Sequence, residues 1–264
     1  MKRLLQAIAV LLLFGIAKLP VERAATQSLV EAHLLSPPLK MDVRDRVGQM
    51  TFVAAFGGLR SLVASITYLQ AYEEWKNMRW AKVDSLFKLI TLLQPRYAKY
   101  WDDASWHMGY NAASSYLFDE ELKPALRGQL YRDYVHRGID ILKDGLRALP
   151  DDPMLWVRLA EIYDRRELDH QKAAECYLQA LRITKNTRFI RFAGYQYAQT
   201  MDPLLWRKAY DLLKSAYDNP KQRRPSVIAE IKSLEKRLEI PLAQRIPDPD
   251  PQGPVHQDPM GPNR

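Results

Sequence analysis

The chain has 264 residues, enough for one or two domains, and its 47% hydrophobic and 10% aromatic residues are sufficient for a substantial core. The formal net charge of +8 favours anionic partners such as lipid headgroups, acidic proteins or nucleic acid, although a solvated basic surface is the commoner explanation. A single cysteine, Cys176, excludes an internal disulfide. Its helical core spacing predicts a buried apolar thiol.

The first 19 residues have the pattern of an export signal. Lys2 and Arg3 precede an uncharged, mainly apolar run at residues 4–17. The run is shorter than the ~20 residues of a bilayer span, and small residues at its end offer a cleavage site. Residues 1–19 are therefore predicted to be an uncleaved anchor or a removed signal peptide, with a buried first helix of a cytosolic protein as the alternative. Export would hold the chain at or beyond the inner membrane and argues against a nucleic-acid partner.

Beyond residue 50 the sequence predicts helices nearly throughout, and small and bulky apolar residues recur in pairs of helical segments. In each pair, apolar residues spaced three and four apart in one segment are followed by a similar set in the next. The sets are Tyr68, Ala71, Tyr72 and Trp75 with Val83, Phe87 and Ile90; Trp101, Ala104, Ser105 and Met108 with Gly138, Leu142 and Gly145; Trp156, Leu159, Ala160 and Tyr163 with Ala173, Tyr177 and Ala180; and Phe189, Phe192 and Ala193 with Ala209, Leu213 and Ala216.

This rhythm predicts an all-α fold, a right-handed α-solenoid of about four helical hairpins followed by a C-terminal capping helix. An unrelated helical bundle is the alternative. The hairpins are expected at 53–95, 96–150, 151–185 and 186–220, with the capping helix at 225–238. The domain limits are a linker at 20–50, the repeat domain at 51–240 with an insertion at 114–129, and a disordered proline-rich tail at 241–264.

No catalytic motif is found in the sequence. It lacks a phosphate-binding loop, a Gly-x-Ser-x-Gly elbow and a His-Glu-x-x-His helix, and no two histidines lie within one helical turn. The adjacent Asp102 and Asp103 point about 100° apart on a helix and do not converge as an acid–base pair. They are explained as charges favourable to the helix dipole. We therefore predict no catalytic residue, no cofactor and no metal.

Polar and aromatic residues fall on the faces that would line the concave side of the solenoid. Trp106 and Tyr110 lie one turn apart and form an aromatic shelf, with Gly109 beside them. An aromatic shelf flanked by carboxylates suits a peptide with one basic and one apolar anchor. Alternatively, the two aromatics cover a neighbouring helix or pack under the 114–129 insertion. The predicted partner-binding residues are Trp106, Tyr110, Asp102, Glu73, Glu161 and Tyr197.

A short motif, "FGGLR" at 56–60, lies upstream of the first pair. Glycines in a helical context cost ~1 kcal/mol each relative to alanine, so Gly57 and Gly58 predict close approach by another helix. Arg60 is expected to be solvated, with contact to lipid headgroups or to an acidic residue as the alternative.

Over residues 53–220 the repeat pattern resembles that of tetratricopeptide repeat proteins. The pieces "FGGLRSLVASITYLQAYE", "LITLLQPRYAKYW" and "WHMGYNAA" are similar to exported or membrane-anchored bacterial repeat proteins of unassigned activity. The resemblance implies an all-helical scaffold that binds proteins without catalysis or a cofactor. Family members that clamp acidic C-termini use Lys and Asn at positions held here by Leu69 and Glu73, so a clamp of that type is not expected.

We therefore expect a non-enzymatic scaffold that binds a protein or peptide partner on its concave face at the bacterial envelope. Two alternatives remain open. One is a structural subunit of an oligomeric envelope complex, and the other is an accessory or carbohydrate-binding protein of a cell-envelope enzyme.

Overall fold

The computed structural model describes residue 28 and residues 58–248. The predicted export segment, nearly all of the predicted linker and most of the predicted tail lie outside these residues. The described start of the predicted disordered tail is ordered, since Ile246 is buried and its N–H donates to Oε1 of Glu235 at 2.7 Å. The described part of the chain is helical with connecting turns and contains no strand, which confirms the all-α class. None of its helices combines the length and hydrophobicity required to cross a bilayer. The chain divides into two compact units, Met1–Tyr97 and Ala98–Arg264.

In the first unit, α4 (Arg60–Lys76) packs against α5 (Trp80–Leu93). The turn between them contains Met78 at a φ of 53°. Helix α5 supplies the large buried side chains, such as Phe87 and Ile90, whereas α4 supplies small ones, such as Ala64 and Ala71. The prediction that Tyr72 packs toward the partner helix is wrong, because its side chain is 51% exposed.

Two details of "FGGLR" differ from the prediction. Arg60 is only 5% exposed rather than solvated. Gly58, with a φ of +73°, precedes α4 instead of lying within a helix, and nothing lies within 4 Å of where its Cβ would be, so the predicted close approach by another helix is wrong at this residue. Gly57 lies outside the described residues. A left-handed φ is readily adopted by glycine, which accounts for glycine at this position just before α4.

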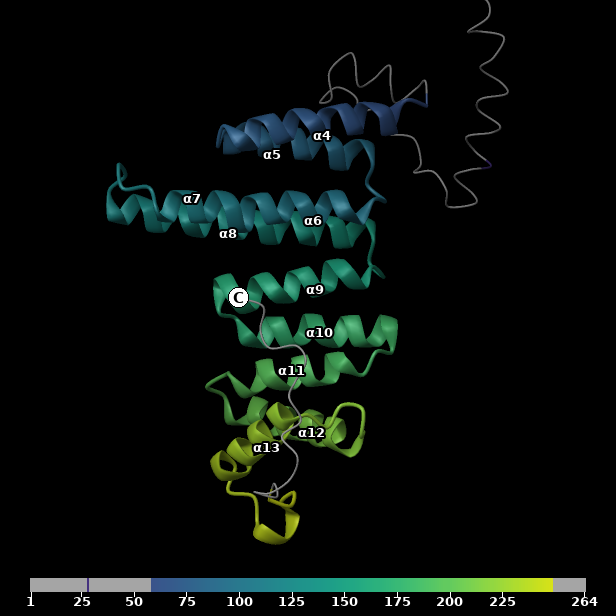
Figure 1. Ribbon diagram of the computed structural model, residues 1–264, viewed down its shortest axis with the longest axis vertical. Coiled ribbons are helices and arrows are strands. Elements are labelled where there is room, and N and C mark those ends of the chain that lie inside the picture. The colour runs from purple at the N-terminus through teal and green to yellow at the C-terminus, as the bar shows by residue number, and fades with distance from the viewer. Residues whose placement is uncertain (1–27, 29–57, 249–264) are drawn as a thin grey trace, which may run out of the picture. The chain divides into compact units, whose positions relative to one another are not determined.

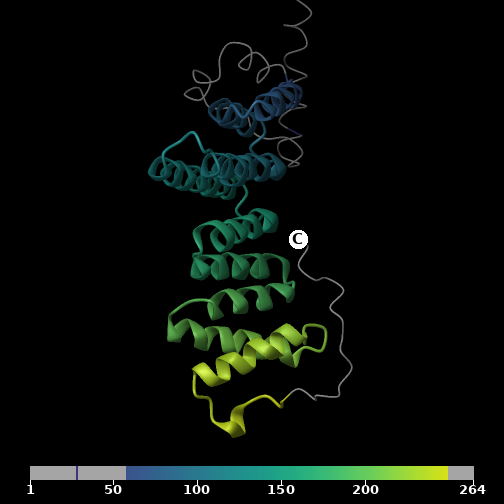
Figure 2. The same ribbon diagram turned by 60° about the vertical axis from the view of Figure 1, so that its left-hand side comes forward.

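The second unit is a succession of helices, each packed against the next in chain order, as both ribbon views show (Figures 1 and 2). The elements are α6 (Ala98–Trp106), the π-helix η1 (His107–Ala112), α7 (Ala113–Leu117), α8 (Pro124–Ala148), α9 (Pro153–Ile162), the π-helix η2 (Tyr163–Glu167), α10 (His170–Thr184), α11 (Arg188–Ala198), α12 (Pro203–Asp218), α13 (Pro225–Arg237) and the 3₁₀ turn η3 (Leu242–Gln244).

Proline and aspartate define where several of these helices begin. Pro153 and Pro203 each occupy a first-turn position, where the missing N–H costs nothing because it would lack a helical partner. The preceding Asp152 accepts a hydrogen bond from a first-turn backbone N–H at 3.0 Å, and Asp202 does so at 2.8 Å. These residues therefore separate α9 and α12 from the helices before them.

The predicted insertion at 114–129 is not a separate element. Residues 114–117 continue the helical run as part of α7, and residues 124–129 form the start of α8, so only 118–123 are non-helical. The second hairpin is long because both of its helical runs are extended, and α7 and α8 pack against each other along this extension. Tyr116 and Tyr134 stack across that extension with ring centroids 5.0 Å apart.

The backbones of η1 and α8 meet closely at Gly109 and Gly138. A Cβ placed on Gly138 would lie 2.8 Å from the Cα and 2.9 Å from the N of Gly109, and one on Gly109 would lie 2.5 Å from Cδ1 of Ile162 in α9. Gly109 is buried and does not face a concave surface as predicted. The elements η1, α8 and α9 thus meet at one point, where neither glycine position has room for a Cβ.

This close approach makes Gly138 intolerant of alanine. Gly138→Ala should lower the free energy of unfolding by ~1–3 kcal/mol because backbone atoms, rather than a flexible side chain, occupy the required space. Urea unfolding followed by far-ultraviolet circular dichroism measures the change.

Gly128, in the same helix, provides the matched control. Its Cβ would meet only the end of the Arg132 side chain, at 3.5 Å. Gly128→Ala should therefore leave stability unchanged or raise it by up to ~1 kcal/mol. Equal losses for the two variants would contradict the close approach as the cause.

Candidate functional site

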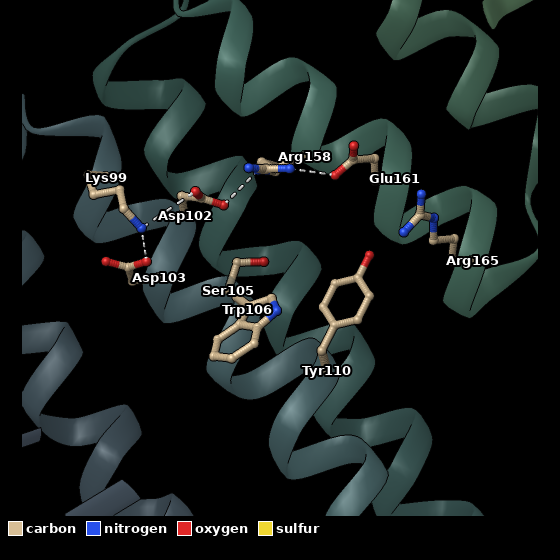
Figure 3. Close-up of a pocket in the computed structure, with 9 residues that line it drawn as sticks. All are labelled: Lys99, Asp102, Asp103, Ser105, Trp106, Tyr110, Arg158, Glu161 and Arg165. Carbon is tan, nitrogen blue, oxygen red and sulfur yellow. Dashed lines mark hydrogen bonds and ion pairs between the residues drawn. The ribbon is translucent and has the colours of Figure 1, made fainter. Parts of the chain in front are cut away.

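One pocket in the second unit brings together four of the six predicted binding residues, Trp106, Tyr110, Asp102 and Glu161 (Figure 3). Its volume is about 500 Å³. The full lining is Lys99, Asp102, Asp103, Ser105, Trp106, Tyr110, Arg158, Glu161 and Arg165. The chain therefore has a defined cavity at the position of the predicted aromatic shelf.

Two helical runs form the walls of this pocket, and each contains a π-helical segment. Tyr110 lies in η1, immediately after α6, and Arg165 lies in η2, immediately after α9. A π-turn contains an extra residue relative to an α-turn, changes the direction of the side chains that follow, and is frequent at functional sites. Both segments place a pocket residue where a continuous α-helix would place a different one.

An ion-pair network joins the two walls. Nε of Arg158 lies 3.0 Å from Oδ1 of Asp102, and its Nη1 donates to Oε2 of Glu161 at 2.8 Å. Asp102 is only 9% exposed. Burial raises the pKa of Asp102 above its ordinary value, and Arg158 opposes that rise. The hydrogen bond to Glu161 raises the pKa of Arg158, so the guanidinium remains charged.

Lys99 neutralises the remaining acidic side of the pocket. It forms an ion pair with Asp103 and lies 4.0 Å from Oδ2 of Asp102. The adjacent aspartates are thus each paired with a cation. No group of three His, Cys, Asp or Glu side chains in the described residues is arranged as a metal site.

Two aromatic rings line the pocket: the Trp106 ring is exposed, and the Tyr110 ring is half-buried under an arginine. Trp106 is 48% exposed and contacts the His107 ring edge-on at a centroid distance of 5.1 Å. The Tyr110 ring is half-buried and carries the Arg166 guanidinium 4.5 Å from its centroid, a cation–π distance. Burial, followed by the charge of Glu161, raises the pKa of Tyr110, so its hydroxyl stays protonated and can donate.

Arg165 differs from the other two cations of the pocket because no residue within 58–248 forms an ion pair or hydrogen bond with it. Ser105 Oγ, Trp106 Nε1 and Tyr110 Oη likewise have no hydrogen-bond partner among those residues. The pocket therefore offers donors, whereas its carboxylates already have cations. Asp102 and Glu161, the carboxylates predicted to hold a basic anchor, share the single cation Arg158.

The other two predicted residues do not join this site. Tyr197 is 5% exposed and lies in the core, because α11 is packed against both α10 and α12 and has no free face at that position. Glu73 belongs to the first unit, where it forms an exposed ion pair with Lys76 at 3.4 Å. It does not line the pocket.

Sequence reasoning missed Lys99, Arg158 and Arg165. The spacing of Arg158 three residues before Glu161 predicts their salt bridge on a helix, but not the bridge from Arg158 to α6. No sequence signal for Arg165 was available, because its direction depends on the π-helical segment η2.

Comparisons with known proteins add no assignment. No protein-family model matches the chain, and no curated protein matches it significantly. The functional argument therefore depends on the geometry of this pocket.

The Asp102–Arg158 pair makes a pH-dependent contribution to stability. A carboxyl whose folded pKa is raised stabilises the fold when protonated, and that contribution is lost as the pH rises through the folded pKa. Arg158→Gln removes the cation that favours ionised Asp102, so its pKa should rise further. The variant should lose ~1–3 kcal/mol of stability at neutral pH and recover most of it as the pH falls toward ~4.

Urea midpoints measured across this pH range for wild type and Arg158→Gln give the result. In the double variant Asp102→Asn/Arg158→Gln, the part of the pH-dependent loss that comes from Asp102 should disappear because that carboxyl is absent. A loss that is the same at every pH would show that Arg158 acts through packing alone.

Proposed function

We propose that this chain is a non-enzymatic helical scaffold whose pocket binds a peptide segment of a protein partner. The segment would carry an acidic side chain next to an apolar one. The observation that carries this proposal is the presence of Arg165, with no ion-pair partner in residues 58–248, in the same pocket as the exposed Trp106 ring. The guanidinium suits a carboxylate, and the indole suits an apolar side chain at low entropic cost.

The proposed architecture is a right-handed solenoid of tetratricopeptide-like hairpins. Burial of the recurring positions supports it: Ala104, Ser105 and Met108 are buried in α6–η1, as are Leu142 and Gly145 in α8. Most of the equivalent residues of the next two pairs are also buried, namely Leu159, Ala160, Tyr163, Ala173, Tyr177, Ala180, Phe189, Ala193, Ala209, Leu213 and Ala216, whereas Trp156 and Phe192 are half-buried.

The capping role of α13 is part of the same proposal. Val227, Ile231 and Leu234 are buried on the side that packs against α12, whereas Lys236 lies on the solvent side. A terminal helix with one polar face prevents the last repeat from exposing an apolar surface.

The proposed location is the bacterial envelope, with the chain held at the inner membrane by residues 1–19 or released beyond it after cleavage. The basic n-region and the apolar run support it. In that setting the partner would be an envelope protein, and no nucleic acid would be available.

Selection of a phage-displayed random 12-residue library on the full-length chain tests the proposed binding. We expect enriched peptides to contain Asp or Glu close to an aromatic residue or leucine. Trp106→Ala and Arg165→Gln should each lower the affinity of a synthetic enriched peptide by about tenfold or more, since each removes a principal contact. Isothermal titration calorimetry measures this affinity.

Two exposed residues outside the pocket supply matched controls. Phe118 is 75% exposed in the turn before α8, and Arg182 is exposed on α10. Phe118→Ala and Arg182→Gln should leave affinity unchanged. Enrichment of peptides that bind the pocket variants and the wild type equally would reject peptide binding at this site, whereas enrichment of basic peptides that depend on Trp106 would reject only the acidic anchor.

A further inference from the structure

Helix α4 has its larger apolar side chains on the outside. Its buried positions are Arg60, Ala64, Thr67 and Ala71. Its exposed large side chains are Leu59, at the N-cap, and Leu62, Ile66, Leu69 and Tyr72, which are between 48% and 66% exposed. We call these five residues the α4 stripe. Their spacing places them along one side of about 20 Å of helix. Burial against α5 does not account for this pattern, because the face toward α5 is the less apolar one.

The α4 stripe is free of charge along its whole length. The other exposed residues between 58 and 72 are glycine, serine or glutamine. Arg60 is the only charged residue in residues 47–72, and it is buried. Charges begin immediately beyond the stripe, where Glu73 pairs with Lys76 and Glu74 pairs with Arg79 and Lys82. The hairpin is therefore divided into an uncharged side and a charged end.

Ser65 on this face satisfies its hydroxyl within the helix. Its Oγ donates to the carbonyl oxygen of Ser61 at 2.9 Å. In hydrocarbon, a polar hydrogen must be satisfied internally, as the hydroxyl hydrogen of Ser65 is.

The area of the α4 stripe also argues against a second copy of the chain as its partner. Five side chains, each about half exposed, present on the order of 500 Å². A stable protein interface buries ~800 Å² on each partner. The stripe is therefore too small to hold a dimer by itself, but it is sufficient for shallow insertion of one helical face.

We infer that the α4 stripe lies in the headgroup–acyl boundary of a lipid bilayer, with the charged end of the hairpin in water. An apolar helix face of this kind inserts ~5–10 Å into the interface. Because each cation at the charged end has a carboxylate partner, insertion should not require anionic lipid. The upstream chain supports this partner, since residues 47–59 are uncharged and a further apolar run is present at residues 4–17.

A local fluorescent probe on the full-length chain tests the inference independently of any membrane attachment through residues 4–17. Ile66→Cys labelled with the environment-sensitive dye NBD reports from the stripe, and Ser85→Cys, exposed on α5, is the matched control. The native Cys176 will not compete for label, because it is 5% exposed and burial raises its pKa to about 12.

The labelled chains are reconstituted with phosphatidylcholine vesicles, with and without doxyl-labelled phosphatidylcholine as a quencher within the acyl region. We expect the emission of the probe at 66 to shift to the blue and to lose most of its intensity to the quencher. The probe at 85 should keep its emission as in water. Adding Leu62→Glu places a charge on the stripe and should return the probe at 66 to its emission in water. Leu69→Cys provides a second labelling position on the stripe.

Three results would overturn the inference. Emission as in water at 66 in the presence of vesicles would show that the stripe does not contact lipid. A blue shift without quenching would show that protein, from this chain or another, covers it. Equal quenching at 66 and 85 would show that contact with lipid is not specific to the stripe.

Discussion

The contact between Gly109 and Gly138 is the constraint on which the pocket depends. Because neither residue has a Cβ, the backbones of η1 and α8 approach one another, and Cδ1 of Ile162 occupies the adjacent space. The contact therefore fixes α9 relative to η1. These two elements carry opposite walls of the pocket, with Tyr110 one residue from Gly109 and Glu161 one residue from Ile162. Close packing of the two glycines therefore positions the pocket residues that lie next to them on η1 and α9.

Charge inside the pocket follows from this arrangement. Once α6 and α9 are adjacent, Arg158 reaches both Asp102 and Glu161 and compensates the buried carboxylate. Burying Asp102 without such a partner would be costly. The same pairing gives both acidic groups a cation within the chain, whereas Arg165, on η2, has no ion-pair partner among residues 58–248. The preference proposed for an acidic ligand therefore follows from the use of Arg158, but not Arg165, in the ion pairs between the walls.

The two units have opposite surface chemistry at their proposed binding faces. The pocket of the second unit combines charges and aromatic rings, which suits a peptide, whereas the α4 stripe of the first unit is apolar and uncharged, which suits lipid. If both proposals hold, one chain would contact a membrane through one unit and a protein through the other. This arrangement is consistent with a scaffold at an envelope membrane and needs no catalytic group.

The sequence by itself determined the helical class, the approximate positions of most helices in the described residues and many of the buried positions. Apolar spacing depends only on the period of the helix, and proline and aspartate mark helix starts locally, as at Asp152 and Pro153. It also identified Trp106, Tyr110, Asp102 and Glu161 as lying on one surface, because equivalent helix positions face the same way.

Tertiary structure decided the rest. Tyr197 is buried because helices pack on both sides of α11, the direction of Arg165 depends on a π-helical segment, and Arg158 pairs with a residue distant in sequence. These features depend on the neighbours of each helix and on small changes in its winding, and neither is encoded in the periodicity of a single segment.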